Sequence, residues 1–396
     1  MKKFYILILF LVLICISGKA QNKLSVNGYV KYMKMVSFQE IDSMWITNSL
    51  IHNRIDIAYF PTDYLNAHIS VRNRFYFGDM VTFSQPPFNA LFGTSGAYNF
   101  IEETAYDAGF FNLSHNLLKG DSYFFNTSID RAFVKFQKGN WELSAGRQRI
   151  NWGQSFVWNP NDIFNAYSYF DFDYEEKPGS DAFRAQYYLD FASRIEVAAA
   201  VNRDTNITAA AYYQFNKWQY DVQVLAGVFN SKDFIMGAGW SGNLWNAAFC
   251  GEMSYFHPLE NPRDSIGTFI ASIGSDYSFK NGCMIQVEIM FNSSIDKDRA
   301  FNLSDFYTQR ISVKNLSYNR WTFFSSFTYP VTPLINLSFF GMYSPQNQFV
   351  FVGPSCGFSV SDNFLLDITI QSFFSDIPTE DGGGGTYAFL RGKWSF

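Results

Sequence analysis

Long stretches of this chain alternate between apolar and polar residues, and this two-residue period limits the folds open to it. In the run 67–77, one alternating set is largely apolar (Ala67, Ile69, Val71, Phe75, Phe77) and the other polar (His68, Ser70, Arg72, Arg74, Tyr76). Successive side chains of a β-strand point to opposite faces of the sheet. The pattern therefore predicts strands with one apolar face and one charged face. The same alternation recurs near Ile55, Val134, Val197 and Val287.

Strand-like runs follow one another from Leu24 onwards, and their connections are alternately short and long. The short connections are PTD after Phe60, KGN at 138–140, DFAS from 190, NK from 216, SGN from 241, KNG from 280, PVTP from 330 and SDN from 361. The longest connections cover roughly 78–125, 151–181 and 294–319. Alternating short turns and long loops are typical of transmembrane barrels, and the count comes to about eighteen strands, with sixteen as the alternative. We therefore predict an all-β fold, a single antiparallel barrel.

Composition indicates that this barrel faces lipid. Charged residues make up 16% of the chain and aromatic residues 20%, and no apolar run beyond the N-terminal segment is long enough for a helical span. Only helices and closed barrels satisfy all backbone hydrogen bonds in lipid. A soluble β-sandwich would also alternate, but it would not need so many strands in one domain.

The polar face should then line a wet lumen, because a charge on the lipid face costs roughly 2–4 kcal/mol at mid-membrane. The residues that we expect to line the lumen are His52, Arg54, His68, Arg72, Arg74, Arg131, Lys135, Arg391 and Lys393.

The segment TYAFLRGKWSF has the same alternation and closes on an aromatic residue, Phe396. It resembles the closing strand of bacterial outer-membrane proteins, in which a terminal Phe is the mark recognised by the barrel assembly machinery. The resemblance implies the bacterial outer membrane as location, contact with its lipid and lipopolysaccharide, and Phe396 as assembly signal.

The N-terminal segment has the composition of a secretory signal peptide. Lys2 and Lys3 precede an almost wholly apolar stretch, and Gly18 and Ala20 supply the small residues of a cleavage site. We expect residues 1–20 to be the signal and 21–396 to be the barrel. The apolar stretch is too short for a spanning helix, and Ile14 before Cys15 disfavours a lipoprotein.

Charge and cysteine content exclude several classes of function. The net charge of −5 argues against nucleic-acid binding. Past the signal, Cys250, Cys283 and Cys356 are odd in number and lack CxxC spacing, which disfavours a disulfide framework or a thiolate metal site. We expect no cofactor and no metal.

The segment from Leu143 to Tyr188 carries the strongest local signal. A strand ends in Gly146-Arg147-Gln148, followed by Asn151-Trp152-Gly153 and then Asn159-Pro160 with Asp162. This GRQ…NWG…NP.D pattern resembles porin-like outer-membrane channels, among them alginate-export-type barrels and substrate-selective porins. The resemblance implies a loop that folds into the barrel and narrows the pore, and it leaves the solute open.

The residue types agree with a constriction. A barrel of sixteen to eighteen strands leaves an aqueous channel unless something fills it, and opposed charges across a narrow path select solutes by size and charge. We expect acidic side chains of the loop to face basic residues of the wall. The candidate constriction residues are Arg147, Arg149, Arg184, Asp162, Asp171, Asp173 and Trp152. The alternative is a loop that points outward with a solvated acidic patch.

Other sites are weaker. The DFDYEE run lacks the spacing and glycine of an EF-hand. The four histidines, at 52, 68, 115 and 257, have no Gly-x-Ser-x-Gly or HExxH motif beside them. We therefore expect no enzyme. The function favoured is passive passage of small hydrophilic solutes, including anionic ones; the alternatives are polysaccharide export, a non-conducting structural barrel, and an outer-membrane hydrolase. The sequence does not indicate an oligomeric state.

Overall fold

The computed structural model describes residues 23–85, 99–167, 169, 175–295, 311–374 and 384–396. The expected signal peptide, residues 1–20, lies outside the described residues, as do Asp171 and Asp173. Across the described ranges, no helix has the length and apolar character needed to cross a membrane.

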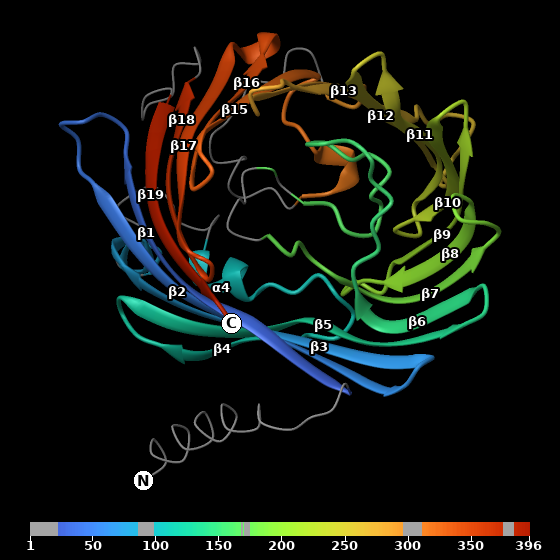
Figure 1. The fold of residues 1–396 in the computed structure, drawn as a ribbon, viewed down its shortest axis with the longest axis horizontal. Helices are drawn as coiled ribbons and strands as arrows, with labels where there is room; N and C mark the ends of the chain where they lie inside the picture. Colours follow the sequence, from blue (N-terminus) through green and yellow to red (C-terminus); the bar gives the residue numbers. More distant parts are fainter. Residues whose placement is uncertain (1–22, 86–98, 168, 170–174, 296–310, 375–383) are drawn as a thin grey trace.

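One antiparallel sheet of 19 strands contains nearly all of the regular structure, and it closes on itself through pairing of β1 with β19 (Figure 1). Eighteen of these strands follow one another round the ring, which confirms the predicted fold class and strand number. The strands are β1 (Leu24–Phe38), β2 (Ile46–Thr62), β3 (Leu65–Gly78), β4 (Ser114–Lys119), β5 (Tyr123–Lys138), β6 (Trp141–Gln148), β7 (Ser180–Tyr188), β8 (Arg194–Val201), β9 (Ile207–Lys217), β10 (Tyr220–Phe229), β11 (Asp233–Leu244), β12 (Ala247–Pro258), β13 (Thr268–Ser278), β14 (Met284–Asn292), β15 (Trp321–Thr332), β16 (Ile335–Ser344), β17 (Phe349–Ser361), β18 (Phe364–Phe374) and β19 (Gly384–Ser395).

The additional strand is β4, which patches the wall. β5 pairs with β3 along one edge, whereas its other edge pairs with β6 over 132–138 and with β4 over 124–128. β6 is short because the chain leaves the wall after Gln148. The segment before β4 completes the gap, with a bridge from Gly109 to Asn202 next to β8. The sequence did not predict this patch.

Eight short connections lie at one rim, where β1 begins and β19 ends. Six of them overlap the places expected from the sequence, whereas the turns after β9 and β11 fall at 218–219 and 245–246, just beyond the expected NK and SGN. The opposite rim carries the long connections, together with short ones such as 230–232. Among the described residues, α2 (Asp79–Phe83) and α4 (Phe100–Ala105) lie between β3 and β4, η2 (Val313–Asn315) lies between β14 and β15, and η3 (Pro345–Asn347) lies between β16 and β17.

Side chains alternate across the wall as the period requires. On β14, Ile285, Val287 and Ile289 are exposed on the outer face, whereas the intervening Glu288 is 1% exposed. An outer face of this kind suits lipid.

The hydrophobic core lies inside the barrel, between the inner wall and the connection from β6 to β7. This connection contributes Ile150, Trp152, Val157, Trp158 and Ile163, and the wall contributes the other large members of the cluster: Tyr212, Leu225, Ile235, Phe256, Ile270, Met290, Phe324 and Phe351. A second cluster, of Val81, Ile101 and Phe124, packs α2 and α4 against β5. The lumen is thus partly filled by the protein's own loops.

Candidate functional site

The connection from β6 to β7, residues 149–179, enters the lumen, and we call it the inner loop (Figure 1, green). Shortly before the chain leaves the wall, at Gly146 on β6, φ is +117° and a Cβ would lie 2.3 Å from the Ala132 carbonyl oxygen. Only glycine adopts this conformation without strain. The motif glycine is therefore explained by the close contact between β6 and β5.

Arg147 fixes the point of departure. Its guanidinium donates to the carboxylates of Asp181 on β7 at 2.8 Å and of Asp107 at 2.6 Å, and to the Phe111 carbonyl at 2.7 Å. Its side chain is 5% exposed. Arg147 therefore ties the patch before β4 to the wall and is not directed at the inner loop.

Two wall carboxylates hold the first half of the inner loop by its backbone. Glu252 on β12 accepts hydrogen bonds from the amides of Gln154, Ser155 (2.7 Å) and Asn161 (2.9 Å). Its side chain is 0% exposed.

Glu288 on β14 accepts from the next three amides, those of Phe156 (3.0 Å), Val157 (2.9 Å) and Trp158 (2.8 Å). Consecutive amides directed at one carboxylate stabilise its charge away from water. The inner loop therefore covers the two wall carboxylates, Glu252 and Glu288.

Neutral wall groups complete the attachment. The Ser254 hydroxyl donates to the Pro160 carbonyl at 2.9 Å, and the Ser272 hydroxyl donates to the Trp158 carbonyl at 2.9 Å. Gln223 on β10 donates to the carbonyl of Trp152 at 2.8 Å. Each partner projects from the inner face of the barrel, so the loop position is set by the wall.

Trp152 is fully buried and links this segment to β8 and β9. Its indole nitrogen donates to Glu196 Oε1 at 2.6 Å, and its ring stacks on Tyr212 with 5.1 Å between ring centroids. Arg184 pairs with the same carboxylate at 2.6 Å. Trp152 and Arg184 thus both bind the Glu196 carboxylate. Glu196 was not among the predicted site residues.

The inner loop then reaches the opposite, basic side of the barrel. Glu175 pairs with Lys393 at 2.6 Å and with Arg391 at 3.3 Å, both on β19. Burial works to raise the pKa of Glu175, but the hydrogen bond and charge of Lys393, together with Lys31 and Arg391, hold it below its usual value. Arg131 on β5 donates to the carbonyl oxygens of Glu176 and Lys177 at 2.7 and 2.9 Å.

The expected pairing of loop acids with Arg147, Arg149 and Arg184 is therefore replaced by a different arrangement. Among the described residues, only Arg149 of these three pairs with an acid of the loop, Asp162, at 2.9 Å. The described loop acids that contact the wall are at 175–176, and their partners come from the set predicted to line the lumen. The physical reason is that other carboxylates already pair with these arginines: Asp181 and Asp107 with Arg147, and Glu196 on β8 with Arg184.

A compact charged cluster lies within the inner loop, formed by Arg149, Asp162, Tyr167 and Lys177. The Lys177 ammonium lies 3.3 Å from the centroid of the Tyr167 ring, and the Arg149 guanidinium lies 5.6 Å from it. Burial raises the pKa of Asp162 to about 7, and burial together with Arg149 lowers the pKa of Lys177 to about 8. Arg149 Nη1 and Asp162 Oδ1 are buried without a hydrogen bond among the described residues. We call these four residues the charge cluster.

The other predicted lumen residues form a network on β2, β3 and β5. Arg54 and Arg72 share Asp130, at 2.5 and 3.1 Å. Lys135 pairs with Glu142 at 3.0 Å. The remaining contacts of this set are Arg74 to the Thr104 carbonyl and Asn126, His52 to the Tyr29 hydroxyl, and His68 stacked on Phe133.

Sequence reasoning missed the side chains that hold the loop: the acceptors Glu196, Glu252 and Glu288, and the donor Gln223. The two-residue period placed Glu196 and Glu288 on the polar face. For Glu288, a carboxylate at mid-strand with no basic neighbour in sequence was the available signal that something else neutralises it.

Phe396 closes the ring of strands. Its backbone amide and carbonyl pair with Gly28 on β1 at 2.9 and 3.0 Å, and its ring lies 5.3 Å from that of Trp394. Within the described ranges no group of three His, Cys, Asp or Glu side chains is arranged to hold a metal ion. The DFDYEE calcium alternative falls mostly outside those ranges.

The sequence matches no protein-family model and no curated protein sequence. Its fold is similar to that of solved outer-membrane porins. OpdK of Pseudomonas aeruginosa, solved with vanillate, has a TM-score of 0.54 at 7% identity over 94% of this chain and 98% of that one. OccK2 (OpdF) of the same organism gives 0.56 at 7% identity with the same coverage, and OccAB1 of Acinetobacter baumannii gives 0.54 at 9% identity over 94% and 97%. At these identities the likeness establishes the barrel fold.

Proposed function

We propose that this protein is a channel of the bacterial outer membrane through which small hydrophilic solutes, anions among them, diffuse passively. The observation that carries the proposal is the inner loop, which is docked inside a closed eighteen-strand barrel. A barrel of this size is wide enough for an aqueous path, and a docked loop narrows that path without closing the barrel wall.

Charge distribution supports a preference for anions. The loop backbone covers Glu252 and Glu288, whereas Arg149 and Lys177 of the charge cluster have one acidic partner, Asp162, between them in the part of the chain that the structure describes. Charged groups beside a narrow path set the local ion concentration strongly. The likeness to OpdK, solved with vanillate, agrees with a small organic solute.

The location follows from the same features. The apolar outer face, the short-turn rim and the aromatic close of β19 support insertion in the outer membrane by the assembly machinery, next to lipid and lipopolysaccharide. We also propose that residues 1–20 are the cleaved signal, that the barrel is not an enzyme, and that the short turns face the periplasm.

Polymer export, suggested by the resemblance of the GRQ…NWG…NP.D motif to alginate-export-type barrels, ranks second. A polymer needs a wide continuous passage, and the loop attached by Glu252 and Glu288 favours a narrow one.

Single-channel recording in planar bilayers tests the proposal. We expect the wild-type protein to conduct, to prefer anions in a salt gradient, and to conduct more after deletion of 155–176. Deletion of the exposed turn residues 261–264, between β12 and β13, is the matched control and should leave conductance unchanged. A correctly folded wild-type barrel without conductance would contradict the proposal and favour a closed structural barrel.

A further inference from the structure

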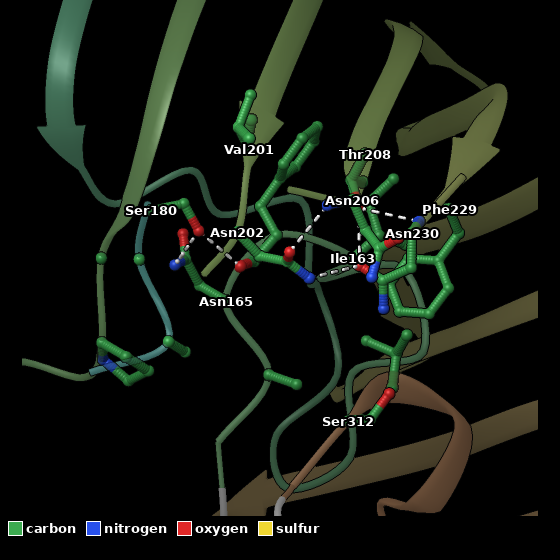
Figure 2. A pocket seen from close by; sticks show the side chains of 18 of the residues that line it. Ile163, Asn165, Ser180, Val201, Asn202, Asn206, Thr208, Phe229, Asn230 and Ser312 are labelled. Carbon is green, nitrogen blue, oxygen red and sulfur yellow. Dashed lines mark hydrogen bonds between the residues drawn. The ribbon is translucent and has the colours of Figure 1, made fainter. Parts of the chain in front are cut away.

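A cavity of about 420 Å³ lies at the long-loop rim, on the side of the inner loop that faces the mouth of the barrel (Figure 2). We call it the mouth cavity. Its volume falls within the range of small-molecule sites, about 300–1,000 Å³. Four parts of the chain line it: the segment before β4 (106–109), the inner loop (163–166 and 178–180), the rim ends of β8 to β10 (200–202, 206, 208, 229 and 230), and the segment 311–313.

The lining is uncharged, and it combines a larger apolar surface with a set of neutral polar side chains. None of its described residues is Asp, Glu, Lys, Arg or His. Its polar side chains are amides and hydroxyls: Tyr106, Asn165, Ser180, Asn202, Asn206, Thr208, Asn230 and Ser312. This composition contrasts with the charge cluster and with the ion pairs on β2, β3 and β5.

Hydrogen bonds among these groups fix the orientation of one amide. Asn230 Oδ1 accepts from Thr208 Oγ1 at 3.2 Å and from Asn202 Nδ2 at 3.5 Å, as Figure 2 shows. Because the oxygen is engaged, the Nδ2 group of Asn230 is the donor that remains available, and it makes no hydrogen bond among the described residues. Asn202 is itself held by the amides of Asp204 and Asn206.

Asn206 contributes a complete amide. Its side chain makes no hydrogen bond with the described residues, whereas its backbone N–H and carbonyl are both engaged with Asn202. A side-chain amide offers two donors and an acceptor side by side. Asn206 and Asn230 together therefore present both donors and acceptors from neighbouring places at the rim (Figure 2).

The chemistry of this lining selects against two classes of ligand. An ion would lose hydration without meeting an opposite charge, which is costly. A wholly apolar ligand would leave the amides without partners, which is also costly. A hydroxyl group both donates and accepts, and it matches an amide. The rings of Phe164 and Phe229 offer apolar surface for the carbon face of such a ligand.

We propose that the mouth cavity binds an uncharged, hydroxyl-rich solute of the sugar or polyol class. The inference deepens the proposed channel function, because it names a solute class that the mouth concentrates before the narrower path. The site itself is tested by binding, which does not depend on conductance.

The test uses the full-length protein, purified in a detergent without a sugar headgroup, with sucrose and sorbitol as probes and benzoate as the charged comparison. Binding is measured by saturation-transfer NMR and by titration calorimetry. Asn206→Leu removes the free amide, and Ala108→Phe fills the cavity while keeping the backbone carbonyl that binds Arg203. Asn246→Leu, at an exposed turn of the opposite rim, is the matched control.

We expect sucrose to bind to the wild type and to Asn246→Leu alike. Each of the two cavity variants should weaken its binding about tenfold, equivalent to about 1.4 kcal/mol. Heat-modifiable migration of each variant verifies that the barrel is folded. Benzoate binding should be the same in the wild type and all three variants.

Three results would overturn the inference: no binding of either neutral probe, sucrose binding that neither cavity variant changes, or benzoate binding that Asn206→Leu weakens. Planar-bilayer recording of the same preparations separates this inference from the proposed function. If the protein conducts but binds no sugar, the channel function stands and the mouth-cavity site is wrong. If it binds sugar in a way that the cavity variants weaken but does not conduct, the site stands and the channel function is wrong.

Discussion

Replacement of Glu288 by alanine should release the inner loop from the wall. The carboxylate accepts three consecutive backbone amides, and its side chain is 1% exposed. Each buried donor left without a partner costs about 1–3 kcal/mol, so the docked state should lose roughly 3–9 kcal/mol. Even the lower figure raises the undocked fraction more than a hundredfold, since each 1.4 kcal/mol is a factor of ten.

The attachment through Glu252 remains in this variant, so the loop should detach over 156–158 and stay held elsewhere. Single-channel conductance in planar bilayers should rise and become noisier, and protease added from the long-loop side should cut within this stretch. Glu288→Gln, which keeps an acceptor oxygen, should have an intermediate effect.

Gln286→Ala provides the matched control. Gln286 lies on the same strand and the same face as Glu288. Among the described residues, its side chain accepts one hydrogen bond, from the Ser326 hydroxyl on the wall. Its loss should leave conductance at the wild-type level. If Glu288→Ala folds and inserts normally but keeps wild-type conductance and protease resistance, the carboxylate does not hold the constriction.

Three further outcomes follow from described contacts. Between pH 6 and 9 Asp162, with a pKa of about 7, gains a negative charge and Lys177, with a pKa of about 8, loses a positive one. Anion preference measured by reversal potential should therefore fall as pH rises. The fall should be smaller in Lys177→Gln and as large as in the wild type in Lys280→Gln, the control. A preference that does not vary with pH would contradict this. Arg147→Gln leaves two buried carboxylates without their partner, so urea titration in lipid vesicles should show a loss of about 3–5 kcal/mol, and an unchanged midpoint would refute its role. Deletion of Phe396 removes two hydrogen bonds to β1, so the heat-modifiable barrel recovered from membranes should decrease, and an unchanged yield would show that the closing residue is dispensable.

The sequence predicted the fold because the determinants of a barrel are local. Strand faces follow from the two-residue period, and the short turns follow from residues such as those at 138–140 and 361–363, which the chain carries in place. The strand β4 escaped prediction for the opposite reason. It sits within a long connection, and its place in the wall exists only because β6 leaves the sheet early.

The attachment of the inner loop could not be predicted for a related reason. The partners of Glu252 and Glu288 lie 91 to 132 residues away in sequence. They are backbone amides, which every residue except proline supplies and which no sequence pattern reveals. Side-chain types suggested that loop acids would meet Arg147 and Arg184, but these arginines had nearer carboxylates on adjoining strands.

The use of main-chain groups to hold the inner loop has a consequence for how solute preference can change. Side chains of 154–158 do not supply the contacts to Glu252 and Glu288, so substitutions there keep these hydrogen bonds, although Val157 and Trp158 also pack in the core and need apolar replacements. Only proline would remove a needed donor. The wall thus fixes the position of the loop backbone. The loop side chains, and with them the solute preference, can change while the barrel stays the same.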